Sequence, residues 1–263
     1  MQLTKHHGLG NDFLVVIDLG DALPVSPALA RAVCDRHRGV GADGLLHVTA
    51  GQATDVTMHL YNADGSRAEM SGNGVSCLAQ AVVRAGLVTR DDVVVATDAG
   101  TRTVTLVGTE DPRTHRATVD MGPAKVGEDE SEWLDEHVRR AARVDVGNPH
   151  LVLHAPRLDT DIDLNARGLE INELVPEGIN VELIAPGPAA GEITMRVYER
   201  GVGLTEACGT GACAAAAAAH QWGMAGANVT VRQPGGPADI VLGHTVQMTV
   251  PVVHIATIEY EAP

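Results

Sequence analysis

The chain has 263 residues, of which 44% are hydrophobic and 20% charged, a composition typical of a globular protein with one large or two modest domains. No apolar run reaches the roughly 18 residues that a bilayer span needs, and the first residues lack an apolar signal core, so we expect a cytoplasmic protein rather than a membrane or secreted one. The formal net charge of -15 repels phosphate backbones, which argues against binding to nucleic acid.

Short strand patterns alternate with a few helical patterns along the chain. Phe13 to Ile17 predicts a buried strand, and Pro27 to His37 predicts a helix with proline at its first position. Asn73 to Ala85 places apolar side chains on one side of a second helix, and Thr210 to Trp222 predicts another. A short helix is predicted near Ile162 to Leu169. Further strands are predicted at 55–61, 93–96, 102–107, 116–121, near 143, and at 180–184, 193–198, 228–231, 238–242 and 246–260.

Two segments of the chain repeat one pattern. In Ala68–Ala79 and again in Thr205–Ala215, a glutamate is followed after one residue by Ser or Cys, then by Gly-x-Gly and a helix of small residues. Internal similarity of this kind is typical of a duplicated unit, so we expect two α/β lobes.

The two Gly-x-Gly turns are candidate binding sites. A helix start leaves backbone N–H groups unpaired at the positive end of the helix dipole, so such a turn is either a tight loop or a site for a carboxylate or phosphate. Cys208 directly precedes the second turn, and we expect the dipole to lower the pKa of its thiol. This thiol suits a nucleophile or a proton-transfer base, and His150 keeps a pairing of the cysteine-protease type open. The other cysteines are expected to be free core thiols: Cys34, Cys77 and Cys213.

Several polar residues fall at predicted strand ends or turns: Asn11, Asn62, Asn148 and Asn180. Asparagines there commonly cap the backbone. Glu199 and Arg200 are adjacent at another strand end, where they either face solvent or grip a zwitterion. In the second case Arg200 would bind a carboxylate and Glu199 an ammonium group.

Seven motifs occur in order: KHHGLGNDF at 5–13, RHRGVGADG at 36–44, NADGS at 62–66, GNPH at 147–150, GINVE at 178–182, ERGVG at 199–203 and ACGTG at 207–211. In these motifs, and nearly from end to end, the chain resembles the diaminopimelate epimerase family. This family comprises cofactor-independent enzymes of lysine and cell-wall precursor synthesis, which interconvert LL- and meso-diaminopimelate.

The resemblance implies an α/β (α+β) fold with two pseudo-symmetric lobes. Each lobe would be a curved, mostly antiparallel sheet around a central helix, with the active site in the cleft between the lobes. The N-terminal lobe would comprise residues 1–113, joined by the C-terminal strand 252–263, and the C-terminal lobe residues 114–251. The resemblance also implies a cytoplasmic homodimer that acts on a small amino acid and uses neither metal nor pyridoxal phosphate.

The resemblance assigns roles to individual residues. The α-carboxylate of the substrate would lie on the helix-start amides of Gly72, Asn73, Gly209 and Thr210. The side chains that read the substrate would be Asn11, Asn62, Asn148, Asn180, Glu199 and Arg200. One thiolate would remove the α-proton and a thiol on the opposite face would return one, which inverts the centre. Cys208 is one of these two bases, and Ser71 stands at the position of the other.

Ser71 is a departure, because the family carries cysteine there, and a hydroxyl is a much weaker acid than a thiol. Serine with a relay could still transfer the proton, or Cys208 could act alone in one-base chemistry. Ser71 could also be an engineered replacement that preserves binding and stops turnover. Another amino-acid racemase and a non-enzymatic binding protein are the remaining alternatives.

Overall fold

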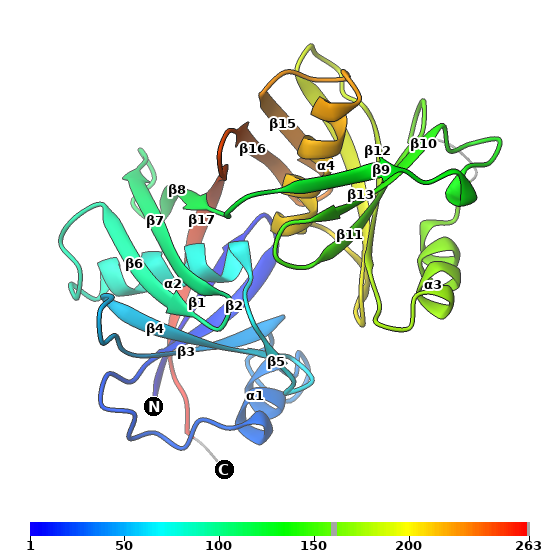
Figure 1. The fold of residues 1–263 in the computed structure, drawn as a ribbon. Coiled ribbons are helices and arrows are strands. Elements are labelled where there is room, and N and C mark those ends of the chain that lie inside the picture. The colour runs from blue at the N-terminus through cyan, green and yellow to red at the C-terminus, as the bar shows by residue number, and fades with distance from the viewer. Residues whose placement is uncertain (159–161, 262–263) are drawn as a thin grey trace. The chain divides into compact units, whose positions relative to one another are not determined.

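The computed structural model describes residues 1–158 and 162–261 (Figure 1). The chain divides into two compact units: unit 1 is Met1–Asp120 with the chain from Val250 onward, and unit 2 is Met121–Thr249. The division falls at 120/121 rather than 113/114 because β8 (Thr114–Asp120) hydrogen-bonds to β7 (Gly100–Gly108) of unit 1. The expected strand 252–263 is the later part of β17 (Val246–Glu259), and residues 262 and 263 lie outside the described part.

Unit 1 is a mixed sheet around a central helix, α2 (Gly72–Arg84). Strands β2 and β3 are parallel neighbours, as are β4 and β6, while the hairpins between neighbouring strands are antiparallel. The other elements that precede β7 are β1 (Gln2–Gly8), β2 (Asn11–Ile17), α1 (Pro27–Cys34), β3 (Gly44–Ala50), β4 (Val56–Asn62), β5 (Arg67–Ala68) and β6 (Asp92–Thr97).

Unit 2 repeats this arrangement around α4 (Gly209–Gln221). Its parallel pairs are β11 with β12 and β13 with β15, at the same places in the order of strands. The two units are therefore internal duplicates, and the predicted α+β fold with a sheet around each central helix is confirmed. The other elements are β9 (Lys125–Asp129), a 3-10 turn (Ser131–Trp133), β10 (Arg140–Asp145), β11 (Pro149–His154), α3 (Leu164–Leu174), β12 (Asn180–Pro186), β13 (Glu192–Glu199), β14 (Gly203–Thr205), β15 (Asn228–Gln233) and β16 (Gly236–Leu242).

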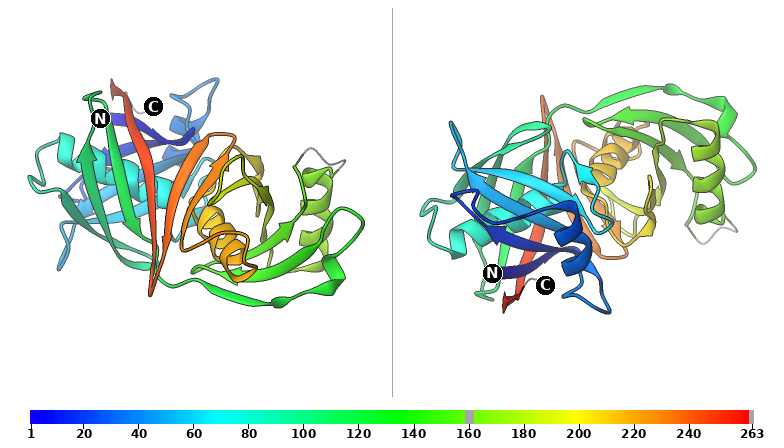
Figure 2. Two further views of the ribbon diagram at one scale, coloured as in Figure 1. Left: turned by 90° about the horizontal axis from the view of Figure 1, so that it is seen from above. Right: turned by 90° about the horizontal axis from the view of Figure 1, so that it is seen from below.

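Each central helix is buried along most of its length. Residues 72–82 of α2 are all buried, and so are residues 211–219 of α4, where the alanine run allows the strands to approach closely. Figure 2 shows from two directions how the strands of each unit enclose its own helix. Both helices agree with the predicted ranges to within one residue at each end.

Other predicted elements differ from the observed ones. The helix predicted over Pro27 to His37 ends at Cys34, because Asp35 is extended and its carboxylate accepts the amides of His37 and Arg38. Strands β1 and β3 had not been predicted, and α3 extends further than expected. Among the described residues, no helix is both long enough and apolar enough to cross a membrane.

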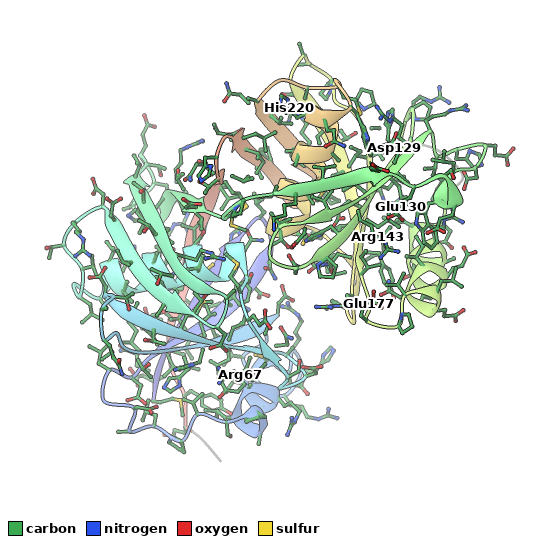
Figure 3. The ribbon with its side chains drawn as sticks, viewed as in Figure 1. Arg67, Asp129, Glu130, Arg143, Glu177 and His220 are labelled. Atoms are coloured by element: carbon green, nitrogen blue, oxygen red, sulfur yellow. The ribbon has the colours of Figure 1, made fainter. Side chains whose placement is uncertain are left out.

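Side-chain hydrogen bonds connect β9 and the residue after it to the rest of unit 2. Arg143 donates to Glu130 at 3.0 Å, and Figure 3 labels both side chains. Asp129 accepts from Arg140 at 2.8 Å and from the indole of Trp222 at 2.9 Å, so the C-terminal end of α4 is tied to this strand.

The last strand, β17, belongs to both units. Its first residues pair with β16 in unit 2, and the residues from Val252 onward pair with β1 in unit 1, where β17 also pairs with β8. The Met1 amino group donates to the carbonyl of Tyr260 at 2.6 Å. The final strand therefore closes the sheet of unit 1 beside the first strand.

Candidate active site

Ser71 is the N-cap of α2 in unit 1. Its backbone is extended and its hydroxyl accepts the amide of Gly74 at 3.1 Å, which leaves the first-turn amides of Gly72 and Asn73 without helical partners. A β-carbon at Gly74 would lie 3.1 Å from Cβ of Ser71, so glycine allows the cap to sit close to the helix. The predicted Gly-x-Gly helix start is confirmed here.

Cys208 occupies the same position on α4 in unit 2. Its sulfur accepts the amide of Gly211 at 3.3 Å and lies 3.5 Å from the hydroxyl of Thr210. Its own amide donates to Oε1 of Gln233 at 2.8 Å. The backbone on both sides of the thiol is therefore fixed, and the sulfur lies at the positive end of a 13-residue helix.

The predicted acidity of Cys208 is wrong. Burial raises the pKa of this thiol well above its usual value, and the carboxylates of Glu199 and Glu182 raise it further. Hydrogen bonds from Thr210 and Gly211 act in the opposite direction but are weaker influences. Cys208 is thus a thiol at neutral pH, because the loss of water and two nearby negative charges outweigh the helix start.

Glu199 ends β13 beside this thiol. Burial raises the pKa of Glu199, while its hydrogen bonds with Thr205 and Cys208 lower it. The hydroxyl of Thr205 donates to Oε1 at 2.5 Å. A carboxylate that is easily protonated, in contact with a thiol, is suited to receive the proton of that thiol.

Three candidate binding side chains belong to unit 1: Asn11, Asn62 and Asn73. Asn73 donates to Oδ1 of Asn11 at 3.4 Å, so these two are brought together. Asn11 in turn donates to Asp43 at 2.9 Å, which fixes the orientation of its amide. Asn62 ends β4 and donates to Ser66 at 2.9 Å within its own turn.

The candidate residues of unit 2 form two hydrogen-bonded groups. Asn148 donates to the hydroxyl of Thr210 at 3.5 Å. Asn180 accepts the amide of Arg200 at 2.9 Å, and the guanidinium of Arg200 donates to the carbonyl of Glu177 at 3.2 Å. Glu199 and Arg200 therefore have different partners, since Glu199 lies beside Cys208.

His150, which the sequence offered as a possible partner of Cys208, pairs instead with two other side chains, and several further site residues were not singled out from the sequence. His150 lies between Glu182 and Asn148, with 2.7 Å to the first and 3.0 Å to the second. In unit 1, Asp12 is bound by Lys5 at 2.9 Å and by Arg36 at 2.7 Å. The signal for these was present, because His150, Glu182, Lys5, Arg36 and Asp12 all lie inside the seven motifs.

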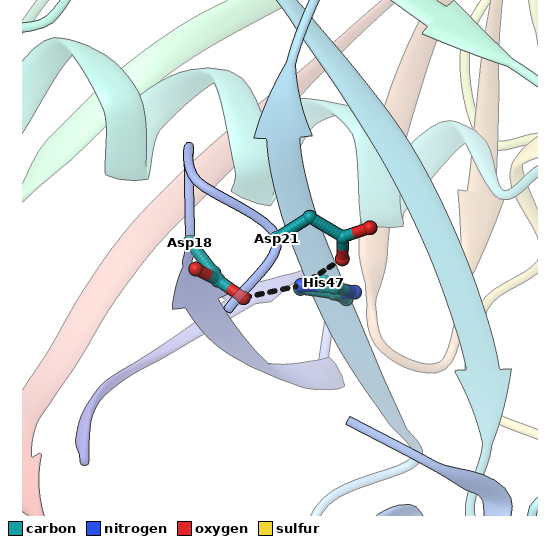
Figure 4. A group of neighbouring side chains, drawn as sticks. All are labelled: Asp18, Asp21 and His47. Atoms are coloured by element: carbon teal, nitrogen blue, oxygen red, sulfur yellow. Dashed lines mark hydrogen bonds and ion pairs between the residues drawn. The ribbon is translucent and has the colours of Figure 1, made fainter. Parts of the chain in front are cut away.

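One group of side chains has the composition of a metal site. Asp18, Asp21 and His47 place their ligand atoms within 4.8 Å of one another in unit 1 (Figure 4). The two oxygens of Asp18 already accept the amides of Ala22 and Leu23, at 3.0 Å and 2.8 Å. The carboxylate of Asp18 therefore caps the turn that follows it, which explains why it is buried.

Comparisons with known proteins identify the family of the chain. The family model described as diaminopimelate epimerase matches residues 3–127 and 142–254. The diaminopimelate epimerase of Desulforudis audaxviator is 43% identical over 252 residues, covering 90% of this chain and 89% of that protein. The one from Mycobacterium ulcerans is 41% identical over 263 residues, covering 91% and 89%.

Solved structures show the same fold. A predicted epimerase from Pseudomonas aeruginosa superposes with a TM-score of 0.76 at 15% identity, covering 100% of this chain and 99% of that one. Together with the sequence matches, this leads to one conclusion. The chain belongs to the diaminopimelate epimerase family and is an isomerase.

Proposed function

We propose that the chain interconverts LL- and meso-diaminopimelate by moving the α-proton from one face of the α-carbon to the other, in lysine and peptidoglycan precursor synthesis. The observation that carries the proposal is the Cys208 thiol at the start of α4, in contact with the Glu199 carboxylate. Membership of the family supports the choice of substrate. The reaction needs no metal and no pyridoxal phosphate, because the helix starts supply the electrostatic stabilisation.

In this proposal Cys208 works on one face. Its proton passes to Glu199, and the resulting thiolate takes the α-proton, so the C–H bond breaks as an S–H bond forms. The electron pair moves toward the substrate carboxylate, which the amides of Gly209 and Thr210 bind. The same thiol returns a proton to this face when the reaction runs the other way.

Ser71 works on the opposite face. Its O–H bond breaks as the new C–H bond forms, and the oxygen left behind is stabilised by the amide of Gly74 and the start of α2. The mechanism requires the two helix starts to reach one substrate molecule. Because a hydroxyl is a weaker acid than a thiol, we expect slow turnover compared with a Ser71→Cys variant.

The remaining candidate residues bind the substrate. The amides of Gly72 and Asn73 would share the carboxylate, and the side chains that read the distal end would be Asn11, Asn62, Asn148, Asn180, Glu199 and Arg200. Their placement at helix starts and strand ends supports this role. We further propose a cytoplasmic homodimer whose partner is the small-molecule substrate, with no nucleic acid or membrane involved.

Proton NMR of LL-diaminopimelate in D₂O under reducing conditions tests the proposal. We expect the α-proton signal to disappear as the meso isomer forms, and Cys208→Ala to abolish both changes. Cys213→Ala is the matched control, because Cys213 is a buried thiol of the same helix away from its start. Ser71→Ala is compared with Ser76→Ala, whose hydroxyl bonds only within α2, at 2.8 Å from the Gly72 carbonyl.

Each outcome separates the alternatives. Exchange without the meso isomer would show that Cys208 acts alone on one face. No exchange in the chain itself, with activity restored by Ser71→Cys, would show a form that binds without turnover. No exchange in either would exclude diaminopimelate as the substrate.

A further inference from the structure

A fully buried ionisable pair lies beneath the start of α4. Glu182 on β12 and His150 on β11 are both 0% exposed, and Oε1 of Glu182 lies 2.7 Å from Nδ1 of His150. The other oxygen of Glu182 has no hydrogen-bond partner within the described residues. An unsatisfied buried carboxylate oxygen is costly, so its presence needs a reason.

The pair lies directly against the Cys208 cap. A β-carbon built on Gly211 would lie 2.7 Å from Oε1 of Glu182 and 3.2 Å from the sulfur of Cys208. The glycine therefore keeps open the space in which the carboxylate and the thiol approach the same turn.

Unit 1 has the same place in its duplicated fold, but there it is apolar. Phe13 lies opposite Gly44 in the parallel β2–β3 pair, as His150 lies opposite Asn180 in the β11–β12 pair. Two residues further along, the counterpart of Glu182 is Leu46. A β-carbon on Gly74 would lie 3.5 Å from Leu46 and 3.3 Å from the hydroxyl of Ser71.

This comparison separates the needs of the fold from those of the site. The same helix start forms over Phe13 and Leu46, so the architecture does not require a charged pair. Replacing a buried ion pair by apolar residues of similar volume is often neutral or stabilising. The charge in unit 2 is therefore retained for something that happens at Cys208 and that differs from what happens at Ser71.

Polar contacts connect the pair to the thiol by a second route. Nε2 of His150 lies 3.0 Å from Oδ1 of Asn148, whose amide donates to Thr210 at 3.5 Å, and the Thr210 hydroxyl lies 3.5 Å from the sulfur. The ionisable groups around Cys208 are Glu182 on β12 with its partner His150 on β11, Glu199 on β13, and Glu206 two residues earlier in the chain.

We propose that Glu182 is a positioning residue for Cys208: its buried negative charge, held in place by His150, keeps the Cys208 thiol protonated in the free enzyme. The proposal rests on the role of Cys208 in the proposed function, in which the protonated thiol returns a proton to the α-carbon when the reaction runs in the reverse direction.

The test is the pH profile of Cys208 alkylation by iodoacetamide, resolved by peptide mass spectrometry, since only the thiolate reacts. We expect Glu182→Gln to lower the midpoint by about one pH unit, so that alkylation below the midpoint is about tenfold faster. Glu192→Gln is the matched control, because Glu192 is a carboxylate of β13 that pairs with Arg232 on the surface. Its midpoint should equal that of the unchanged chain.

A second variant covers the case in which Glu182→Gln fails to fold. Glu182→Met places an apolar side chain where unit 1 has Leu46, and the same downward shift is expected. A midpoint that stays within about 0.3 pH unit of the unchanged chain in the folded variants would overturn the proposal. Because alkylation needs no substrate, this outcome is independent of whether diaminopimelate is turned over.

Discussion

We expect unit 1 to lose stability in mild acid because of the buried side chain of His6. This side chain is 0% exposed on β1, and its Nδ1 lies 2.7 Å from Oε1 of Gln80. The amide nitrogen of Gln80 donates to the carbonyl of Val252, so Oε1 is the acceptor and His6 carries its proton on Nδ1. Nε2 then accepts from the hydroxyl of Thr4 at 2.9 Å. Both nitrogens of the neutral His6 ring therefore have a hydrogen-bond partner.

The size of the effect follows from the pKa. Burial lowers the pKa of His6 from 6.5 to about 4, and the neighbouring His254 and Arg84 contribute to the lowering. Between these values the unfolded chain binds a proton that the folded chain refuses, so stability is complete above pH 6.5 and falls as the pH drops toward 4. A shift of this size corresponds to about 3 kcal/mol at 1.36 kcal/mol per pH unit.

Urea titrations at several pH values between 7.5 and 4 test this prediction. Both tryptophans lie in unit 2, but the buried thiol of Cys77 lies in unit 1, so its labelling by dithiodipyridine reports the opening of that unit. His6→Asn is the comparison, because its amide can still donate to Gln80 but does not titrate. The stability difference between the two proteins should shrink by about 3 kcal/mol as the pH falls. A difference that is constant with pH would refute the reasoning.

Three further substitutions have definite expected outcomes. Gly211→Ala should reduce turnover and stability more than Gly74→Ala, by about 1–3 kcal/mol in the free energy of unfolding, because its β-carbon would lie 2.7 Å from Glu182; equal denaturation midpoints would contradict this. Gly168→Ala should lower the melting temperature of unit 2 by several degrees, since the new β-carbon would overlap the ring of Tyr198. An unchanged transition in calorimetry would show that the Tyr198 ring can move aside. Asp43→Asn should raise KM, because it weakens the hold on the amide of Asn11, and should also lower stability, because Asp43 pairs with Arg36 at 2.7 Å; an unchanged KM in the folded variant would contradict a binding role for Asn11.

The helix starts are the part of the molecule that the sequence predicts best. Gly-x-Gly after a polar residue, followed by apolar residues at helical spacing, is a local pattern, and both α2 and α4 begin within one residue of the predicted position. Strand β1 was missed because its run QLTKHHG is mostly polar. His6 is nevertheless buried there, since Gln80 and Thr4 satisfy both of its nitrogens, and no periodicity can show that.

The acid–base state of the candidate site could not be predicted for a similar reason. The sequence places Cys208 at a helix start, which by itself favours the thiolate. The groups that reverse this preference, Glu182 and Glu199, come from two different strands and act only because the fold buries them beside the sulfur. Local pattern predicts the dipole, while the desolvation and the two charges depend on tertiary packing.

The position of β17 has a consequence for synthesis on the ribosome. All of unit 2 up to Val246 emerges before the strand that pairs with β1, so the sheet of unit 1 has an open edge at β1 until β17 has left the exit tunnel. Unit 2 can complete most of its pairings earlier, whereas unit 1 must wait with its first strand unprotected. The half of the molecule that is made first is therefore finished last, and truncation near the C-terminus damages the N-terminal half of the chain.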